Sequence, residues 1–195
     1  MTSTPQIIML HKPKGVVVTR SDELGRKTIY DILPDWVRQQ GWLPVGRLDQ
    51  DSRGLLLLVQ DGSLIDPLTK PGRFPKVYEV WVRGHVSTEH LKLLQGGVQT
   101  SIGVLKCDRV EILGMVLHKT HLYVTLVEGK NRHIRRMYGA LRDPERNTPL
   151  KVLELKRTQF GPIQLDVESG KWRHLESTEI SDLLQAAGRV LDSPL

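Results

Sequence analysis

The chain has 195 residues and a mass of 22.1 kDa, enough for one substantial core or two small lobes but not for several independent domains. Its 28 Lys and Arg residues outnumber 22 Asp and Glu residues, and the formal net charge of +6 favours an anionic partner. A single cysteine excludes an internal disulfide and a zinc ribbon, and no signal peptide or membrane-spanning stretch is visible, so we expect a soluble, cytoplasmic protein.

Short apolar runs, most of them rich in β-branched residues, predict strands along the whole chain. These runs lie at 7–10, 16–18, 55–59, 77–82, 110–113, 122–127 and 152–155. Helices are fewer, and are predicted to begin at Thr28, Ser87 and Ser177 and to end before Pro34, near Gly96 and before Gly188. Because strands outnumber helices and do not alternate with long ones, we predict an α+β fold with a mixed, largely antiparallel sheet.

A dense polar loop stands immediately before the apolar run at 55–59. Asp49 and Asp51 lie two positions apart in it, with Arg47 and Arg53 interleaved. Neighbouring cations keep carboxylates ionised, as a nucleophile or a general base requires. The charge pattern alone also fits a solvated turn with a surface ion pair, which is a common and weak feature of proteins.

A Tyr-containing strand is predicted at 76–82. Its period of two places Tyr78 on one face with Val80 and Val82, and Lys76 lies two residues before the tyrosine. Tyr78 could stack on a nucleobase, although spacing alone favours a tyrosine of the core.

A basic helix is predicted after Asn131, the expected N-cap. Its buried stripe consists of Ile134, Met137, Tyr138 and Leu141. Arg132, Arg135 and Arg136 project from a different face and can meet a phosphate or a carboxylate, while a solvated basic helix is the alternative.

Metal and cofactor signals are missing from the sequence. His118 and His121 point to opposite faces of a predicted strand, and no glycine-rich nucleotide loop is present. We expect neither a metal nor a cofactor.

Several motifs, in this order and spacing, resemble the RsuA/RluB/RluE/RluF family of pseudouridine synthases. The similarity covers roughly residues 6–184, with His133 standing where the family often has Gln. The motifs are Leu10-His-Lys-Pro-Lys-Gly15, Gly46-Arg-Leu-Asp49 with Asp51, Ser52 and Gly54, Lys76 with Tyr78, 129–137, Leu155-Lys-Arg-Thr158 with Gly161, and Gly170-Lys-Trp-Arg173.

The resemblance implies the pseudouridine synthase fold, an α+β fold with two lobes and a central catalytic cleft. The catalytic domain would span 6–184 and be followed by a flexible tail at 185–195, and the first five residues are expected to be frayed. The S4 RNA-binding domain that most members carry ahead of the catalytic unit is not in this sequence, which resembles the RluE type of the family.

The implied activity is the isomerisation of a specific uridine to pseudouridine in ribosomal RNA, most closely that of the 23S large-subunit RNA or of a ribosome assembly intermediate, by a monomer. Asp49 would be the essential carboxylate, paired with Arg135, and Tyr78 would stack on the uracil. Arg47 would help to flip the nucleotide. The implied or candidate RNA contacts are Lys12, Lys14, Lys76, Arg132 and Arg136.

The residues leave alternatives open. Asp49 could form a covalent adduct or abstract a ribose proton to give a glycal. The protein could also be a non-catalytic RNA-binding or assembly factor, or an isomerase acting on small-subunit or transfer RNA.

Overall fold

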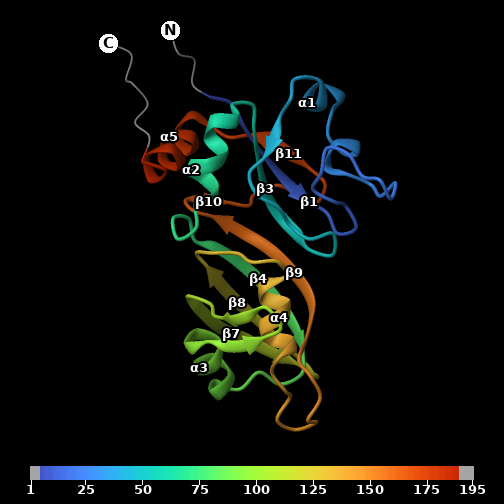
Figure 1. The fold of residues 1–195 in the computed structure, drawn as a ribbon, viewed down its shortest axis with the longest axis vertical. Helices are drawn as coiled ribbons and strands as arrows, with labels where there is room; N and C mark the ends of the chain where they lie inside the picture. The colour runs from blue at the N-terminus through green and yellow to red at the C-terminus, as the bar shows by residue number, and fades with distance from the viewer. Residues whose placement is uncertain (1–4, 189–195) are drawn as a thin grey trace. The chain divides into compact units, whose positions relative to one another are not determined.

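A computed structural model describes residues 5–188, and the chain divides into two compact units. One unit, here the N/C unit, is formed by the residues up to Phe74 together with those from Arg157 onward, and the other, the middle unit, by Pro75–Lys156 (Figure 1). The fold is mixed α+β, and β1 pairs antiparallel with β11 and β3, as β8 does with β4 and β7. The largely antiparallel sheet is as predicted.

The N/C unit contains a sheet in the order β11-β1-β3-β9, with β2 added to β3 and β10 added to β9. Its central strands are buried because β1 and β3 are almost continuously apolar. Its elements are β1 (Ile7–Lys12), η1 (Ile29–Asp31), α1 (Asp35–Gln39), β2 (Leu43–Pro44), β3 (Arg53–Val59), η2 (Gly62–Leu64), α2 (Ile65–Thr69), the end of β9 (Lys151–Phe160), β10 (Ile163–Gln164), β11 (Trp172–His174) and α5 (Ser177–Ala186).

The core of the N/C unit forms where one face of β1 and β3 packs against α2 and α5. Met9 and Leu57 face the same core as Leu183 of α5, and Phe74 stacks on Phe160 there with ring centroids 5.4 Å apart. This packing fixes the two central strands on which the polar loops of the unit are mounted.

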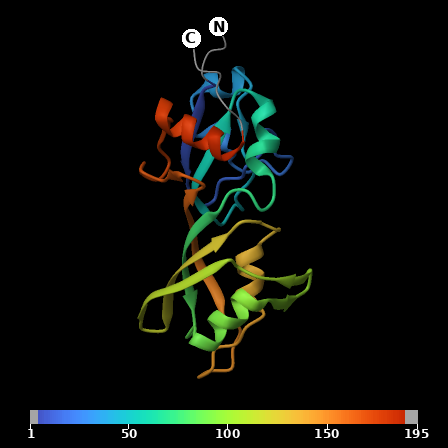
Figure 2. The ribbon, with the colours of Figure 1, turned by 90° about the vertical axis from the view of Figure 1, so that its left-hand side faces the viewer.

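The middle unit contains strands in the order β9-β4-β8-β7 and a separate hairpin of β5 and β6. Its helices α3 and α4 lie on one side of these strands (Figure 2). Its elements are β4 (Lys76–Arg83), α3 (Thr88–Gly96), β5 (Val98–Thr100), β6 (Gly103–Leu105), β7 (Arg109–Val116), β8 (Lys119–Leu126), α4 (His133–Gly139) and the start of β9.

Most predicted elements are confirmed, and two short ones are not. The run at 16–18 forms only an isolated bridge between Val17 and Thr28, and the helix predicted after Thr28 is a single 3-10 turn. Pro34 disfavours a helical backbone at Leu33, the residue before it, which works against a longer helix here. The helix expected from Ser87 is present as α3, with Ser87 as its N-cap.

The predicted flexible tail begins too early. Helix α5 continues to Ala186, and Ala187 is only 3% exposed and belongs to the core of the N/C unit. The predicted boundary at 185 is therefore wrong, because the apolar face of α5 extends past it. Residues 1–4 and 189–195, where the other frayed ends were predicted, lie outside the described residues.

Candidate functional site

The loop that carries Asp49 connects β2 to β3 in the N/C unit. The amide of Val45 donates to the carbonyl of Leu57, which ties the start of the loop to β3, and the amide of Ser52 donates to the carbonyl of Asp49 over 3.0 Å, which closes a turn. Asp49 and Asp51 are both partly exposed. The turn therefore holds two carboxylates at the surface immediately before a buried strand.

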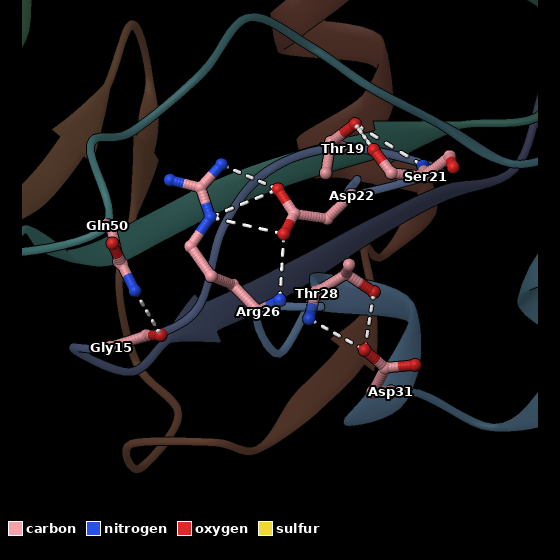
Figure 3. A network of polar contacts seen from close by, with 8 residues as sticks. All are labelled: Gly15, Thr19, Ser21, Asp22, Arg26, Thr28, Asp31 and Gln50. Carbon is pink, nitrogen blue, oxygen red and sulfur yellow. Dashed lines mark hydrogen bonds and ion pairs between the residues drawn. The ribbon is translucent and has the colours of Figure 1, made fainter. Parts of the chain in front are cut away.

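A second loop is attached to this one through Gln50. The amide of Gly15 donates to the carbonyl of Gln50 over 2.8 Å, and the side-chain amide of Gln50 donates back to the carbonyl of Gly15 over 3.2 Å (Figure 3). Gly15 adopts a φ of 88°, which favours glycine. Two hydrogen bonds between the same residues fix the position of the Asp49 loop relative to 13–16.

The loop after Gly15 is itself ordered by polar contacts. The guanidinium of Arg26 binds the carboxylate of Asp22 in a forked arrangement, and Asp31 accepts hydrogen bonds from the amide and hydroxyl of Thr28 (Figure 3). Hydrogen bonds from Arg26 lower the pKa of Asp22. The segment that follows Gly15, the residue bonded to the Asp49 loop, is therefore held in place by hydrogen bonds of its own.

Lys12 corrects one of the sequence predictions. It is 0% exposed, and its ammonium donates to the carbonyls of Val16 over 2.6 Å and Pro13 over 3.0 Å. Burial lowers the pKa of Lys12 to about 8, while the charges of Asp49 and Asp51 act in the opposite direction. The prediction that Lys12 contacts RNA phosphates is therefore wrong for this structure, because its ammonium organises the loop beside the two aspartates instead.

Behind the Asp49 loop, β3 and β9 approach closely at Gly54. This residue has a φ of 113°, and a Cβ there would collide with the backbone of Arg157. Arg157 is buried, and its Nε donates to the carbonyl of Leu55 over 2.7 Å. The buried side chain of Arg157 thus fixes β3 at Leu55, close to the point where the Asp49 loop enters this strand.

The other predicted residues of the N/C unit lie at its surface. Arg47 and Lys14 are exposed, as a residue that contacts RNA must be. Their predicted roles in flipping the nucleotide and contacting phosphate remain predictions.

In the middle unit, Tyr78 lies on β4 with Val80 and Val82 on the buried face, as the alternation predicted. It is 8% exposed, so its ring is mostly enclosed. Lys76 is half-buried, and its ammonium donates to the carbonyl of Val127 over 3.4 Å. Tyr78 is therefore held rigidly, while its proposed contact with a base is not tested by the free structure.

Helix α4 begins one residue later than predicted. Its N-cap is Arg132, in the left-handed region with a φ of 51°, and not Asn131. The predicted stripe is buried, although Leu141 lies two residues beyond the end of the helix at Gly139. Arg132 is exposed at the helix start, a place where the backbone favours an anion.

His133 fixes the start of α4 from inside. Its Nδ1 accepts a hydrogen bond from the amide of Lys130, and its Nε2 lies 3.0 Å from the carbonyl of Lys106. This pattern assigns the neutral tautomer with the proton on Nε2. Burial lowers the pKa of His133, which agrees with that assignment.

The remaining two arginines of α4 are already engaged within the middle unit. Nη1 of Arg135 donates to the carbonyl of Val152 in β9 over 3.1 Å. Arg136 donates to the carbonyl and side-chain oxygens of Asn131 and to the hydroxyl of Ser101. Arg136 therefore braces its own loop, and an RNA contact by this residue requires those bonds to be exchanged.

The structure brings the predicted residues together in two sets, one in each unit. Lys12, Lys14, Arg47 and Asp49 belong to the N/C unit, and the others belong to the middle unit: Lys76, Tyr78, Arg132, Arg135 and Arg136. Sequence reasoning missed Gln50 and Arg157 as supports of the Asp49 loop. Nothing in the spacing of the chain could have paired Gln50 with Gly15, 35 positions away.

The same chain matches a known family model. Residues 6–140 match the model described as RNA pseudouridylate synthase. The chain belongs to the RNA pseudouridylate synthase family. It is 36% identical over 190 residues to ribosomal large subunit pseudouridine synthase B of Pseudomonas aeruginosa, covering 95% of this chain and 47% of that protein. It is also 36% identical over 185 residues to an uncharacterized RNA pseudouridine synthase of Aquifex aeolicus, covering 93% of this chain and 70% of that protein.

Solved structures give the same result for the fold. A crystal structure of a pseudouridylate synthase aligns with a TM-score of 0.79 and 29% identity, over 92% of this chain and 74% of that chain. An H/ACA ribonucleoprotein bound to a substrate RNA containing 2′-deoxyuridine aligns with a TM-score of 0.60 at 20% identity, over 83% of this chain and 49% of that chain, which supports the fold alone. The predicted pseudouridine synthase fold is thereby confirmed.

The chain spans about half the length of several of its curated relatives. It covers 47%, 52% and 54% of the large-subunit synthases of Pseudomonas aeruginosa, Pasteurella multocida and Vibrio vulnificus. The similarity includes the Asp49 loop, Tyr78 and α4, which all lie within the matched residues 6–140.

Proposed function

We propose that this protein isomerises a specific uridine to pseudouridine in large-subunit ribosomal RNA, with the carboxylate of Asp49 as the reacting group. The observation that carries the proposal is the Asp49 turn, closed by Ser52 and fixed to Gly15 through Gln50, in a chain of the RNA pseudouridylate synthase family. The large-subunit target is supported by the similar proteins of Pseudomonas aeruginosa and Pasteurella multocida, which are both named ribosomal large subunit pseudouridine synthase B.

The reaction needs little more than a positioned carboxylate. The C1′–N1 bond breaks, the uracil rotates and C5 bonds to C1′. The C5 proton then leaves and N1 takes up a proton, so atoms are conserved and the change is an isomerisation without net redox. Asp49 would either add to the substrate and be released again or remove and return a ribose proton. The base must leave the stack first, at a cost of a few kcal/mol, which phosphate contacts offset.

The partners of Asp49 are proposed on family grounds. Arg135 would pair with the carboxylate and orient it, and Tyr78 would stack on the uracil and assist loss of the C5 proton. Arg47 would help to replace the extruded nucleotide. The finer assignment to the RluE type, a monomeric state and a cytoplasmic location are also proposals. In the described part of the chain, no helix has the length and apolar character needed to cross a membrane.

The decisive experiment is a nucleotide-resolution pseudouridine map. Ribosomal and transfer RNA from cells lacking the gene would be compared after complementation with wild type or with Asp49→Asn, using carbodiimide modification and primer extension. We expect one large-subunit position to lose its signal on deletion and to regain it only with wild type. The identity of that uridine would also separate the RluE type from type B.

Binding by the same variant is the matched control. Asp49→Asn keeps the size and hydrogen-bonding shape of the side chain, so the folded variant should bind RNA within about twofold of wild type. Normal turnover by Asp49→Asn would contradict the proposal. An unchanged map in every RNA would favour a binding-only role.

A further inference from the structure

Three exposed cations gather at one end of the middle unit, outside the residues assigned above. Arg83 is the last residue of β4, Lys119 the first of β8 and Lys151 the first of β9. Arg83 and Lys119 are direct cross-strand partners. Arg83 and Lys151 line one open pocket of about 420 Å³ together with Thr148, Pro149 and Leu150. We call Arg83, Lys119 and Lys151 the Arg83 patch.

The free protein holds these cations together at a cost. Like charges directly opposite each other on neighbouring strands repel, and within residues 5–188 no carboxylate pairs with any of the three. Two acids of the 143–146 turn have other partners or are buried. Oε1 of Glu145 lies 3.3 Å from Nδ1 of His85, and Asp143 is buried. An anion bound at the patch would relieve this repulsion.

Asp143 makes the base of the patch rigid. It is only 3% exposed and accepts hydrogen bonds from the amides of His85, Glu145 and Arg146. Burial alone would raise the pKa of Asp143, but these amides hold it below its usual value. The carboxylate of Asp143 therefore binds backbone amides and does not pair with the surface cations.

The strand ends under the patch are also locked. The hydroxyl of Thr120 donates to the carbonyl of Gly84 over 2.8 Å and accepts the amide of Val86 over 3.1 Å. Gly84 has a φ of 111°, and a Cβ there would collide with the side chain of Leu150. The backbones that carry the three cations are therefore fixed before any ligand arrives, which lowers the entropic cost of binding.

The position of the patch indicates which part of an RNA it would meet. Arg83 follows Tyr78 by five residues on β4 (83 minus 78), about 17 Å at roughly 3.3 Å per residue. An odd separation places the two side chains on opposite faces of the strand. The patch is thus too far from Tyr78 to touch the same nucleotide. Because Arg83 is the last residue of β4, the patch can meet RNA that continues past this end of the strand.

We propose that the Arg83 patch binds phosphodiester groups of the RNA segment flanking the target uridine, an inference that rests on the proposed function. Exposed Lys and Arg side chains without carboxylate partners are the groups that neutralise phosphates, and such contacts position an RNA without reading its sequence. Arg83 and Lys151, which both line the pocket, make the principal contacts.

The test compares two double variants of the full chain with equal loss of charge. Arg83→Gln with Lys151→Gln removes two patch cations, whereas Lys70→Gln with Lys92→Gln removes two exposed cations elsewhere. Binding to an unmodified large-subunit RNA transcript is measured by filter retention between 0.05 and 0.3 M salt, and the single-turnover rate is measured at saturating enzyme. We expect the patch variant to bind about tenfold more weakly at 0.1 M salt, with a salt slope smaller by roughly two.

The remaining outcomes separate this inference from the proposed function. The single-turnover rate of the patch variant at saturation should equal that of wild type, because the patch does not touch the reacting uridine. Wild-type affinity and slope in the patch variant, or an equal loss in the control variant, would overturn the inference. If wild type forms no pseudouridine while the patch variant alone loses affinity, the proposed function fails and the phosphate contact stands.

RNA truncation provides an independent check. Shortening the duplex next to the mapped uridine should weaken binding by wild type but have little further effect on the patch variant, because both changes remove the same contact. Fully additive losses would mean that the patch contacts something other than the flanking segment.

Discussion

At the scale of single residues, Lys12 shows how a charged side chain can serve a site without facing solvent. Its ammonium satisfies the carbonyls of Pro13 and Val16, and it lies in the electrostatic reach of Asp49 and Asp51. A buried amine is costly unless it is hydrogen-bonded and paired. Here the two hydrogen bonds and the nearby carboxylates offset the cost of burying the ammonium.

The pH dependence of stability should reveal this buried amine. The folded-state pKa of Lys12 is lowered from 10.5 to about 8, so between these values the unfolded chain binds more protons than the folded one, and stability rises with pH. The contribution of Lys12 is least favourable below pH 8. In Lys12→Met, that rise should shrink by on the order of 1 kcal/mol, after allowance for screening.

Urea denaturation of wild type and Lys12→Met at pH 7.5, 9 and 10.5 measures this difference. The comparison cancels the titration of other groups that both proteins share. Identical pH profiles would show that Lys12 has an ordinary pKa in the folded protein.

At the scale of elements, the junction of β3 and β9 demands a glycine. Gly54 has a φ of 113°, and a side chain there would meet the backbone of Arg157, which cannot move aside as a flexible side chain can. The closeness of the two strands is what allows Arg157 to reach the carbonyl of Leu55. The Asp49 loop depends on this junction because it leads directly into β3.

Gly54→Ala should therefore destabilise the protein by about 2–3 kcal/mol or more, by strain of the backbone. Gly114→Ala in β7 is the matched control, since a Cβ there meets nothing within 4 Å and its φ is not positive. Thermal or urea unfolding of both variants tests the argument. Equal stability of the two would contradict the proposed close approach.

Helix α4 depends in a similar way on His133. The ring accepts from the amide of Lys130 and donates to the carbonyl of Lys106, a pair of bonds that a glutamine amide can also make. Its lowered pKa means that the unfolded chain takes up a proton more readily than the folded chain as pH falls below about 6.5. Stability is then lost with falling pH until the folded ring also protonates.

His133→Gln should therefore equal wild type in stability at pH 7.5 within about 1 kcal/mol, and lose less stability between pH 7 and pH 5.5. His133→Leu, which makes neither bond, is the destabilised reference. Denaturant titrations at the two pH values measure this, and a steeper acid loss in His133→Gln than in wild type would exclude the neutral tautomer.

At the scale of the whole molecule, the net charge of +6 and the proposed phosphate contacts make RNA binding electrostatic. For about four phosphate contacts, raising salt from 0.05 to 0.2 M should weaken binding roughly 100-fold. Asp49→Asn should show the same slope as wild type, because the carboxylate makes no phosphate contact. Filter binding at four salt concentrations checks this, and an affinity independent of salt would argue against a phosphate-based interface.

The chain by itself determined the class of fold, the positions of the six longest strands and the motifs that place it in its family. These depend on local patterns: the period of two in β4, the apolar runs of β1 and β3, and the stripe of α4 are visible from neighbouring residues alone. The same patterns could not show that 16–18 forms no strand.

Only the tertiary structure decided what individual polar residues do. Lys12 was predicted at a phosphate and is buried, Gln50 was overlooked and fixes the Asp49 loop, and Arg136 braces its own loop. The reason is physical: whether a polar side chain meets solvent, a carbonyl or a carboxylate depends on how segments pack. Some of these partners lie far away in the chain, as Gly15 does for Gln50 and Leu55 for Arg157. Local spacing determines on which face of a helix or strand a side chain lies. Its burial and its hydrogen-bond partners depend on how the strands and loops pack.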